Sequence, residues 1–270
     1  MIRTPFLSRQ EHFDVVGSTS DVVRGWLADG VPEVCLAVAD EQSAGRGREG
    51  RTWTAPASRA LLLSIGFRPT WLPSDQVWRL AAVTSMAMAD AAEDVAGLAP
   101  GTIRLKWPND LVVEEDGRVR KLAGVLGETD GLGTDNPQAV VGIGINADWP
   151  ADEFPPELAD GMTSLRAAAG GGAVDTASLL DAFTAALEPL VDRLRQGEFD
   201  GAGWADRQLT NGRLVRLIGH DGHDEVVRAL GVDATSGALN VESETPSGAG
   251  TGRRSVVSGE IQHLRLDGGV

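Results

Sequence analysis

The apolar positions of this chain form short runs of strand length and a few longer segments with helical periodicity. Strands are expected at residues 34–39, 61–67, 103–107, 111–113, 121–126 and 140–145, each bounded by polar or glycine-containing segments. The acidic, glycine-containing sequence at 114–117 separates two of these runs and predicts a hairpin. Because strands outnumber helices and several follow one another directly, the pattern predicts an α+β fold with a mainly antiparallel or mixed sheet.

Three segments have helical periodicity. Ser20 is placed to cap a helix that ends at Gly30. An alanine-rich helix is expected at 77–96. An amphipathic helix is expected at 176–195, where Pro189 should introduce a kink.

The pattern changes after residue 211. Short strands are expected at 214–218, 226–230, 239–241 and 255–257, with polar, glycine-rich turns between them and a hairpin tip at 244–252. They predict a small all-β barrel of roughly 60 residues, a size that is hard to stabilise alone, so it should lean on the rest of the chain. We therefore expect a main domain at 1–211 and a small domain at 212–270.

Composition and charge narrow the function classes. A formal net charge of −15 and a pI of about 4.6 disfavour non-specific binding to nucleic acid or to anionic membranes. Cys35 is the only cysteine, so no intrachain disulfide can form. The N-terminus lacks the pattern of a signal peptide, and the apolar segment 80–92 is too short to span a bilayer. These features predict a soluble, cytoplasmic protein.

Against this acidic background, residues 42–51 concentrate arginine and glycine. Glycine allows close backbone approach to a ligand, and arginine offers a fork of donors for carboxylate or phosphate. The spacing of Gly45, Gly47 and Gly50 matches the G-x-G-x-x-G dinucleotide fingerprint, but Pro56 and its neighbours do not open the required helix. The fingerprint is therefore rejected. An anion-binding loop and a plain solvated basic loop both remain possible from this segment alone.

Other polar clusters accompany the loop, each with a plainer interpretation. Residues 17–20 place hydroxyls at a helix N-terminus, where simple capping would suffice. Residues 106–110, Lys-Trp-Pro-Asn-Asp, crowd charged and amide groups at a strand end, where an ordinary turn with a core tryptophan would suffice. Residues 121–128 and 141–146 set polar side chains beside glycine-containing strands. Lys121 could equally be a solvent-facing cation.

Taken in order, the clusters resemble the biotin protein ligases. The family pattern is G-S-T-(N/S), Q-x-x-G-R-G-R-x-G-R-x-W, K-W-P-N-D, K-(L/I)-x-G-(I/V)-L-x-E and G-(I/V)-G-(I/L)-N, and all five motifs occur here between residues 17 and 146. Two positions depart from it: Ser20 stands where Asn is more usual, and Glu49 where basic residues are common. Neither departure removes a group that the chemistry requires.

The resemblance implies a catalytic domain similar to class II aminoacyl-tRNA synthetases, with a mixed sheet, and a C-terminal SH3-like β-barrel that closes on residues 259–261. It implies that biotin and ATP, with Mg²⁺, are joined to biotinyl-5′-AMP. Biotin then passes to a lysine on the biotin carboxyl carrier domain of a carboxylase. Since only about 16 residues precede Gly17 and the net charge is −15, we expect a dedicated ligase without a DNA-binding domain. The ligase is expected to be a monomer or a homodimer.

The resemblance also assigns roles to individual residues. Biotin binding is expected of Ser18, Thr19, Ser20, Gln42, Gly45, Arg46, Gly47, Arg48, Lys121 and Gly124. ATP binding is expected of Arg48, Arg51, Trp53, Lys106, Asn109 and Asn146. Catalysis is expected of Lys121, Arg48 and Asp110, and the metal ligands stay unassigned.

Three alternative functions are less favoured by the sequence. A lipoate–protein ligase would share the sheet and a key lysine but is disfavoured by the arginine loop and K-W-P-N-D. A biotin-binding regulator without catalysis is disfavoured by the intact Lys121. Metal binding at residues 220–224, which contain two histidines, is less favoured than a solvated loop.

Overall fold

The structure is a computed structural model, and it describes residues 6–219, 224–243, 252–257 and 259–263. The α-helices in these ranges are α1 (Thr19–Ala28), α2 (Trp78–Ala96), α3 (Leu165–Ala168), α4 (Thr176–Arg195) and α5 (Gly201–Asp206). The strands of the main sheet are β1 (Arg9–Val16), β2 (Cys35–Gln42), β3 (Ala60–Phe67), β4 (Ile103–Lys106), β5 (Asp110–Glu115), β6 (Arg118–Asp130) and β7 (Gln138–Asn146). Those of a second sheet are β8 (Leu214–Ile218), β9 (Asp224–Val232), β10 (Leu239–Ser243), β11 (Arg253–Val256) and β12 (Glu260–His263). None of the helices within these ranges is both long enough and apolar enough to cross a membrane.

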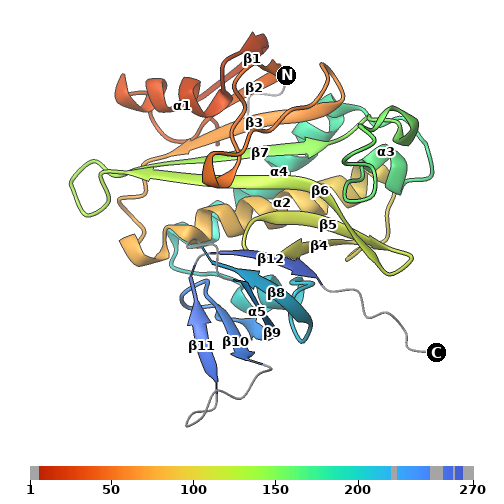
Figure 1. The fold of residues 1–270 in the computed structure, drawn as a ribbon. Coiled ribbons are helices and arrows are strands. Elements are labelled where there is room, and N and C mark those ends of the chain that lie inside the picture. Colours follow the sequence, from red (N-terminus) through yellow and green to blue (C-terminus); the bar gives the residue numbers. More distant parts are fainter. Residues whose placement is uncertain (1–5, 220–223, 244–251, 258, 264–270) are drawn as a thin grey trace, which may run out of the picture.

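The main sheet is mixed, as expected for the α+β fold. Its described strands follow the order β1-β2-β3-β7-β6-β5-β4 (Figure 1). Only the β1–β2 pair is parallel among the pairs described in this sheet. β1 was not predicted from the sequence, because a polar edge strand carries no apolar run.

The two faces of the main sheet differ in what they carry. Helices α2 and α4 pack together against one face, over alternate apolar residues such as Leu61, Leu63 and Ile65 of β3. The residues that alternate with them, Leu62, Ser64 and Gly66, point to the other face. Helix α1 covers one end of that second face (Figure 1). The rest of this face is open to the groups that form the candidate site.

Gly66 lets α1 approach the sheet closely. A Cβ built there would lie 2.6 Å from a methyl carbon of Val23 and 2.7 Å from the sulfur of Cys35, closer than real contacts allow. The Cys35 thiol is buried in this cluster, and burial raises its pKa to about 11. It is therefore a packing residue rather than a reactive thiolate.

The C-terminal region forms a separate antiparallel sheet in the order β11-β10-β9-β8-β12, drawn in blue beneath the main sheet (Figure 1). Its core includes Val215, Val227, Leu239 and Ile261, and also Trp107 from the turn between β4 and β5. The indole N–H of Trp107 donates to the carbonyl of Gly237 at 3.1 Å. The tryptophan of K-W-P-N-D is thus a core residue that joins the two sheets.

Element boundaries agree with the sequence pattern in some places and depart in others. Helix α4 matches the predicted range and continues through Pro189. The hairpin turn between β5 and β6 is Asp116–Gly117, both with positive φ, as a type I′ turn requires. The cap assigned to Ser20 is wrong: Ser18 precedes the first helical residue, and Ser20 lies inside α1. Residues 220–223 and 244–251, which hold most of the expected histidine turn and hairpin tip, lie outside the described residues.

Candidate active site

A pocket opens on the second face of the main sheet, between α1, the segment 46–53 and the strand-end turn 107–109. Its floor is made of small residues on adjacent strands, because Gly124 of β6 and Gly144 of β7 are register partners. The indole of Trp53 lies on this floor. A Cβ built at Gly144 would be 2.5 Å from the ring, so glycine is needed there for the tryptophan to lie flat against the sheet.

One end of the pocket is a buried cluster of hydroxyl and amide groups. The backbone N–H and the hydroxyl of Thr19 lie 2.8 and 3.1 Å from the amide oxygen of Gln42. The hydroxyl of Ser64 lies 2.7 Å from that of Thr19 and 3.0 Å from that of Ser20. Ser18 is buried beside them. The N-terminal turn of α1 thus faces a polar recess rather than solvent.

Ser64 was missed by the sequence analysis. It is fully buried, and it is a hydroxyl residue within the otherwise apolar β3, which is the signal that could have revealed it. Gly142 of β7 lies opposite, where a Cβ would come within 3.0 Å of the Ser20 hydroxyl. Glycine at this position therefore keeps the polar recess open.

The other end of the pocket holds two lysines around one carboxylate. Lys121 Nζ is 2.7 Å from Asp110 Oδ1, and Lys106 Nζ is 3.8 Å from Asp110 Oδ2. They are the only lysines in the sequence. Burial lowers the pKa of Lys106, with the nearby Lys121 charge adding to the effect and Asp110 opposing it. Two cations thus share one anion, leaving the cluster positive and suited to an anionic ligand.

A β-bulge aims Lys121 into the pocket. Lys121 pairs with Val112, and Ala123 pairs with the residue before Val112, so Leu122 is an extra residue on β6. Strict alternation would place Lys121 and Gly124 on opposite faces of the sheet. With the bulge, Leu122 turns into the core and Lys121 reaches the pocket, where its ammonium lies 5.5 Å from the Trp53 ring centre.

The backbone of Lys121 is fixed from outside the sheet. Its N–H donates to the carbonyl of Gly161 at 2.8 Å, and its carbonyl accepts from the N–H of Thr163 at 2.9 Å. Asn146, expected to bind ATP, is buried and donates its amide to the carbonyl of Thr163 at 2.9 Å. The structure therefore gives Asn146 a supporting position behind Lys121.

Asn109 also makes structural bonds. Its side-chain amide donates to the carbonyl of Val125 at 2.9 Å, and the N–H of Val125 donates back to its carbonyl at 2.8 Å. This reciprocal pair ties the turn 107–109 to β6. Asp110 and Lys106 on either side are held in place as a result.

The segment that carries the arginines is a tight hairpin, drawn in orange across the face of β7 and β6 (Figure 1). The N–H of Trp53 donates to the carbonyl of Gly45 at 3.0 Å, and the N–H of Gly47 donates to that of Arg51 at 2.7 Å. A Cβ at Gly45 would lie 2.4 Å from the Trp53 carbonyl oxygen, so glycine is required where the hairpin closes. The segment is therefore an ordered hairpin, with residues 49–52 exposed at its tip.

The three arginines have different partners. Arg46 pairs with Asp21 and Glu128. Burial lowers the pKa of Arg46, but hydrogen bonds from these two carboxylates raise it above its ordinary value overall. The Arg48 guanidinium donates to the carbonyl of Gly259 at 3.1 Å, and Arg51 binds the Glu260 carboxylate through both nitrogens at 3.2 and 2.8 Å. The tip of the hairpin thus docks on the second sheet.

Most of the site residues predicted from sequence converge. Those that line the pocket are Ser18, Thr19, Ser20, Gln42, Arg46, Gly47, Arg48, Arg51, Trp53, Lys106, Asn109, Asp110, Lys121 and Gly124. Among the described residues, Gly45 and Asn146 stand behind the lining rather than in it. Ser64 and Glu260, to which no motif assigned a role, also line the pocket.

The mixed sheet thus carries a pocket with a polar recess at one end and a positively charged region at the other. The chain belongs to the biotin/lipoate A/B protein ligase family, whose model matches residues 12–146.

Individual relatives agree with this assignment. The bifunctional ligase/repressor BirA of Bacillus spizizenii is 33% identical over 58% of this chain and 46% of its own length. The chain thus spans about half the length of the first curated relatives that it matches. The biotin–[acetyl-CoA-carboxylase] ligase of Mycobacterium tuberculosis is 30% identical over 93% of this chain and 89% of its own. That of Paracoccus denitrificans is 34% identical over 71% and 75%.

Solved structures have the same fold. The biotin protein ligase from Aquifex aeolicus in complex with biotin and ATP aligns with a TM-score of 0.74 over 97% of this chain and 100% of that one. The two sequences are 24% identical, so the likeness shows the α+β fold and its mixed sheet.

Proposed function

We propose that this chain is a biotin protein ligase, which forms biotinyl-5′-AMP from biotin and ATP and transfers biotin to a lysine of a biotin carboxyl carrier domain. The observation that carries the proposal is the single pocket that joins two chemically different ends. One end is a buried hydroxyl and amide recess, and the other is a lysine pair beside the arginine hairpin. A head group and an activated carboxylate can occupy such a pocket together.

The polar recess favours biotin over lipoate, the other acid that the family's name includes. The ureido group of biotin has two N–H donors and a carbonyl acceptor, which match the buried hydroxyls of Thr19 and Ser64 and the amide of Gln42. The dithiolane ring of lipoate offers no comparable hydrogen bonds. Placing it here would desolvate these groups without compensation.

In the first step, a carboxylate oxygen of biotin attacks the α-phosphorus of ATP, the acyl–phosphate bond forms and pyrophosphate leaves. Two anions must approach each other, so positive charge is the main requirement. Lys121 supplies it from the sheet, and Arg48 from the hairpin. Asp110 fixes the Lys121 ammonium from 2.7 Å.

In the second step, the amine of the acceptor lysine attacks the acyl carbon. The amide bond forms, AMP leaves with the bonding electron pair, and the amine loses a proton. Trp53, on the pocket floor, is positioned to contact the adenosine portion. Its buried indole N–H has no hydrogen-bond partner among the described residues.

Mg²⁺ fits the pocket as the partner of the triphosphate. Asp110 and Glu260 are the carboxylates among the described residues that line it, and Mg²⁺ is commonly held by one or two carboxylates together with substrate phosphates. When bound, the ion would neutralise charge on the leaving pyrophosphate. Asp110 would then be shared between the ion and the two lysines.

The second sheet supports the remaining assignments. We propose that residues 212–270 form an SH3-like barrel and residues 1–211 the catalytic domain, because the second sheet gathers its apolar residues in a separate cluster, which Trp107 alone joins from the rest of the described chain. The acceptor is proposed to be a carboxylase carrier domain, and the setting the cytoplasm. The ligase is proposed to act as a monomer or homodimer without binding DNA.

The proposal is tested by incubating the purified protein with biotin, MgATP and a carrier domain, followed by mass spectrometry of the carrier. We expect one biotinyl group on one lysine. Lipoate in place of biotin is the matched control. Modification by lipoate but not by biotin would replace this proposal with the lipoate ligase alternative.

A further inference from the structure

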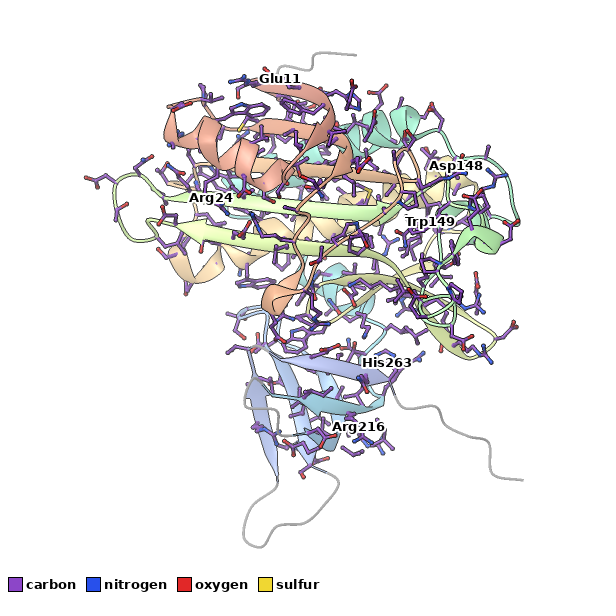
Figure 2. The ribbon with its side chains drawn as sticks, turned by 45° about the horizontal axis from the view of Figure 1, so that its top comes forward. Glu11, Arg24, Asp148, Trp149, Arg216 and His263 are labelled. Atoms are coloured by element: carbon purple, nitrogen blue, oxygen red, sulfur yellow. The ribbon has the colours of Figure 1, made fainter. Side chains whose placement is uncertain are left out.

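The base of the arginine hairpin is held by a closed ring of four charged side chains at the rim of the pocket. Arg46 of the hairpin directs one nitrogen to both carboxylate oxygens of Asp21 at 2.8 Å, and the other to Glu128 at 3.1 Å. Arg24 completes the ring at 2.7 Å from Asp21 and 3.0 Å from Glu128. Figure 2 shows Arg24 on α1, beside the strands of the main sheet.

The ring differs from an isolated surface ion pair. Each carboxylate meets both arginines and each arginine meets both carboxylates, so the four charges compensate one another. An exposed pair alone contributes little, but several charges joined in a network contribute more. The ring also joins α1, β6 and the hairpin, which are far apart in the sequence. Asp21 is further favoured by its place in the first turn of α1.

The hairpin transmits the position of Arg46 to its tip. Arg46 forms an antiparallel bridge with Thr52, and the bonds from Gly47 to Arg51 and from Trp53 to Gly45 close the turns on either side. Arg48 therefore moves with Arg46 as one unit. Because the Arg46 guanidinium is already bound to two carboxylates, its charge is committed to this ring rather than to a ligand anion.

We propose that Asp21 and Glu128 are positioning residues for the arginine hairpin. Through Arg46 they hold the hairpin against the sheet, so that Arg48 and Trp53 meet the adenylate in a prearranged geometry. The proposal rests on the proposed ligase function for its kinetic consequence, but its structural consequence can be measured without substrate.

The structural test uses trypsin, which cleaves after arginine and therefore within the hairpin when it lifts. The double variant Asp21→Asn, Glu128→Gln keeps side-chain size and removes both charges. We expect cleavage within residues 46–51 to become about five to ten times faster, as loss of a network of exposed pairs predicts. The control is Glu242→Gln, which breaks a similarly exposed pair with Arg253 on the second sheet. Parental cleavage in the double variant would overturn the proposal.

The kinetic test measures how long the purified protein retains radiolabelled biotinyl-AMP. We expect the double variant to lose biotinyl-AMP several times faster than the parent, at unchanged melting temperature. The single variant Asp21→Glu, which keeps the charge, should retain biotinyl-AMP nearly as long as the parent. Faster release from Glu242→Gln as well, or release from Asp21→Glu as fast as from the double variant, would overturn the positioning role. If the parent forms no adenylate, the proposed function fails, while the trypsin comparison still decides whether the ring holds the hairpin.

Discussion

Replacing Lys121 by methionine removes its charge and keeps most of its apolar stem. Lys121 lies 2.7 Å from Asp110 in a pocket bounded by protein on several sides, where a positioned cation interacts with developing charge more strongly than in water. Loss of one such group in a transition state costs about 3–4 kcal/mol, or roughly 10²- to 10³-fold in rate. We therefore expect adenylate formation to fall by about that factor.

The same change should leave folding nearly intact. The Lys121 side chain is 39% exposed, so its ion pair with Asp110, discounted for solvent screening, is worth at most about 1 kcal/mol. For a chain of this size that corresponds to roughly 2–4 °C in melting temperature. Lys106 still lies 3.8 Å from Asp110 and keeps that carboxylate partly compensated.

The assay is biotin-dependent exchange of pyrophosphate into ATP, with thermal melting measured on the same samples. Arg120→Met is the matched control, because Arg120 is the adjacent cation on β6 and pairs with Glu115 at 2.9 Å outside the pocket. Exchange by Lys121→Met at the rate of Arg120→Met would refute the assignment of Lys121. A collapse of the melting temperature would instead show that its pairing with Asp110 supports the fold.

Other predictions follow from single contacts. Arg48→Gly should release biotinyl-AMP faster and label bystander lysines, which a gel of added bystander protein detects; unchanged retention of the adenylate would contradict this. In Gly144→Ala the new Cβ would lie 2.5 Å from the Trp53 ring, so the ring should move away from the sheet. The KM for ATP should then rise more than the KM for biotin, as measured by the same exchange assay. Burial, with the charges of Lys106 and Arg213, lowers the pKa of His263 to about 4 (Figure 2 labels His263 on β12). Since the unfolded chain takes up that proton near pH 6.5, the free energy of unfolding should decrease by at most about 3 kcal/mol as pH falls from 6.5 to 4; urea titrations should show a flatter profile for His263→Gln.

Local periodicity predicted the elements whose apolar residues are contiguous. The bounds of α4 and the hairpin of β5 and β6 were available from the pattern alone, because α4 buries one stripe and the turn needs residues that accept positive φ. β1 was missed because its pairing with β2, and no apolar pattern of its own, makes it a strand. The position of Ser18 before α1 was also missed, since Ser18, Thr19 and Ser20 offer equivalent caps.

The candidate site was predicted as a set of residues but not as an arrangement. The motifs located the lysine, arginine and hydroxyl groups, yet nothing local distinguishes Arg46, which is bound in a ring, from Arg48 at the tip. Likewise, the direction of Lys121 depends on a bulge opposite β5. Both facts come from contacts between distant segments, which spacing within one segment cannot encode.

The pocket and the core are built from the same strands by the same alternation. On β7, Val141, Ile143 and Ile145 face the helices, while Gly142 and Gly144 between them face the pocket. The apolar side chains are buried against the helices and stabilise the sheet. The glycines have no side chain, so they leave the pocket deep on the opposite face. Substitutions on the two faces should therefore have different effects. Changes at the apolar positions should lower stability, and changes at the glycines should weaken ligand binding. The G-x-G-x-N motif therefore marks one strand that stabilises the fold through one face and shapes the pocket through the other.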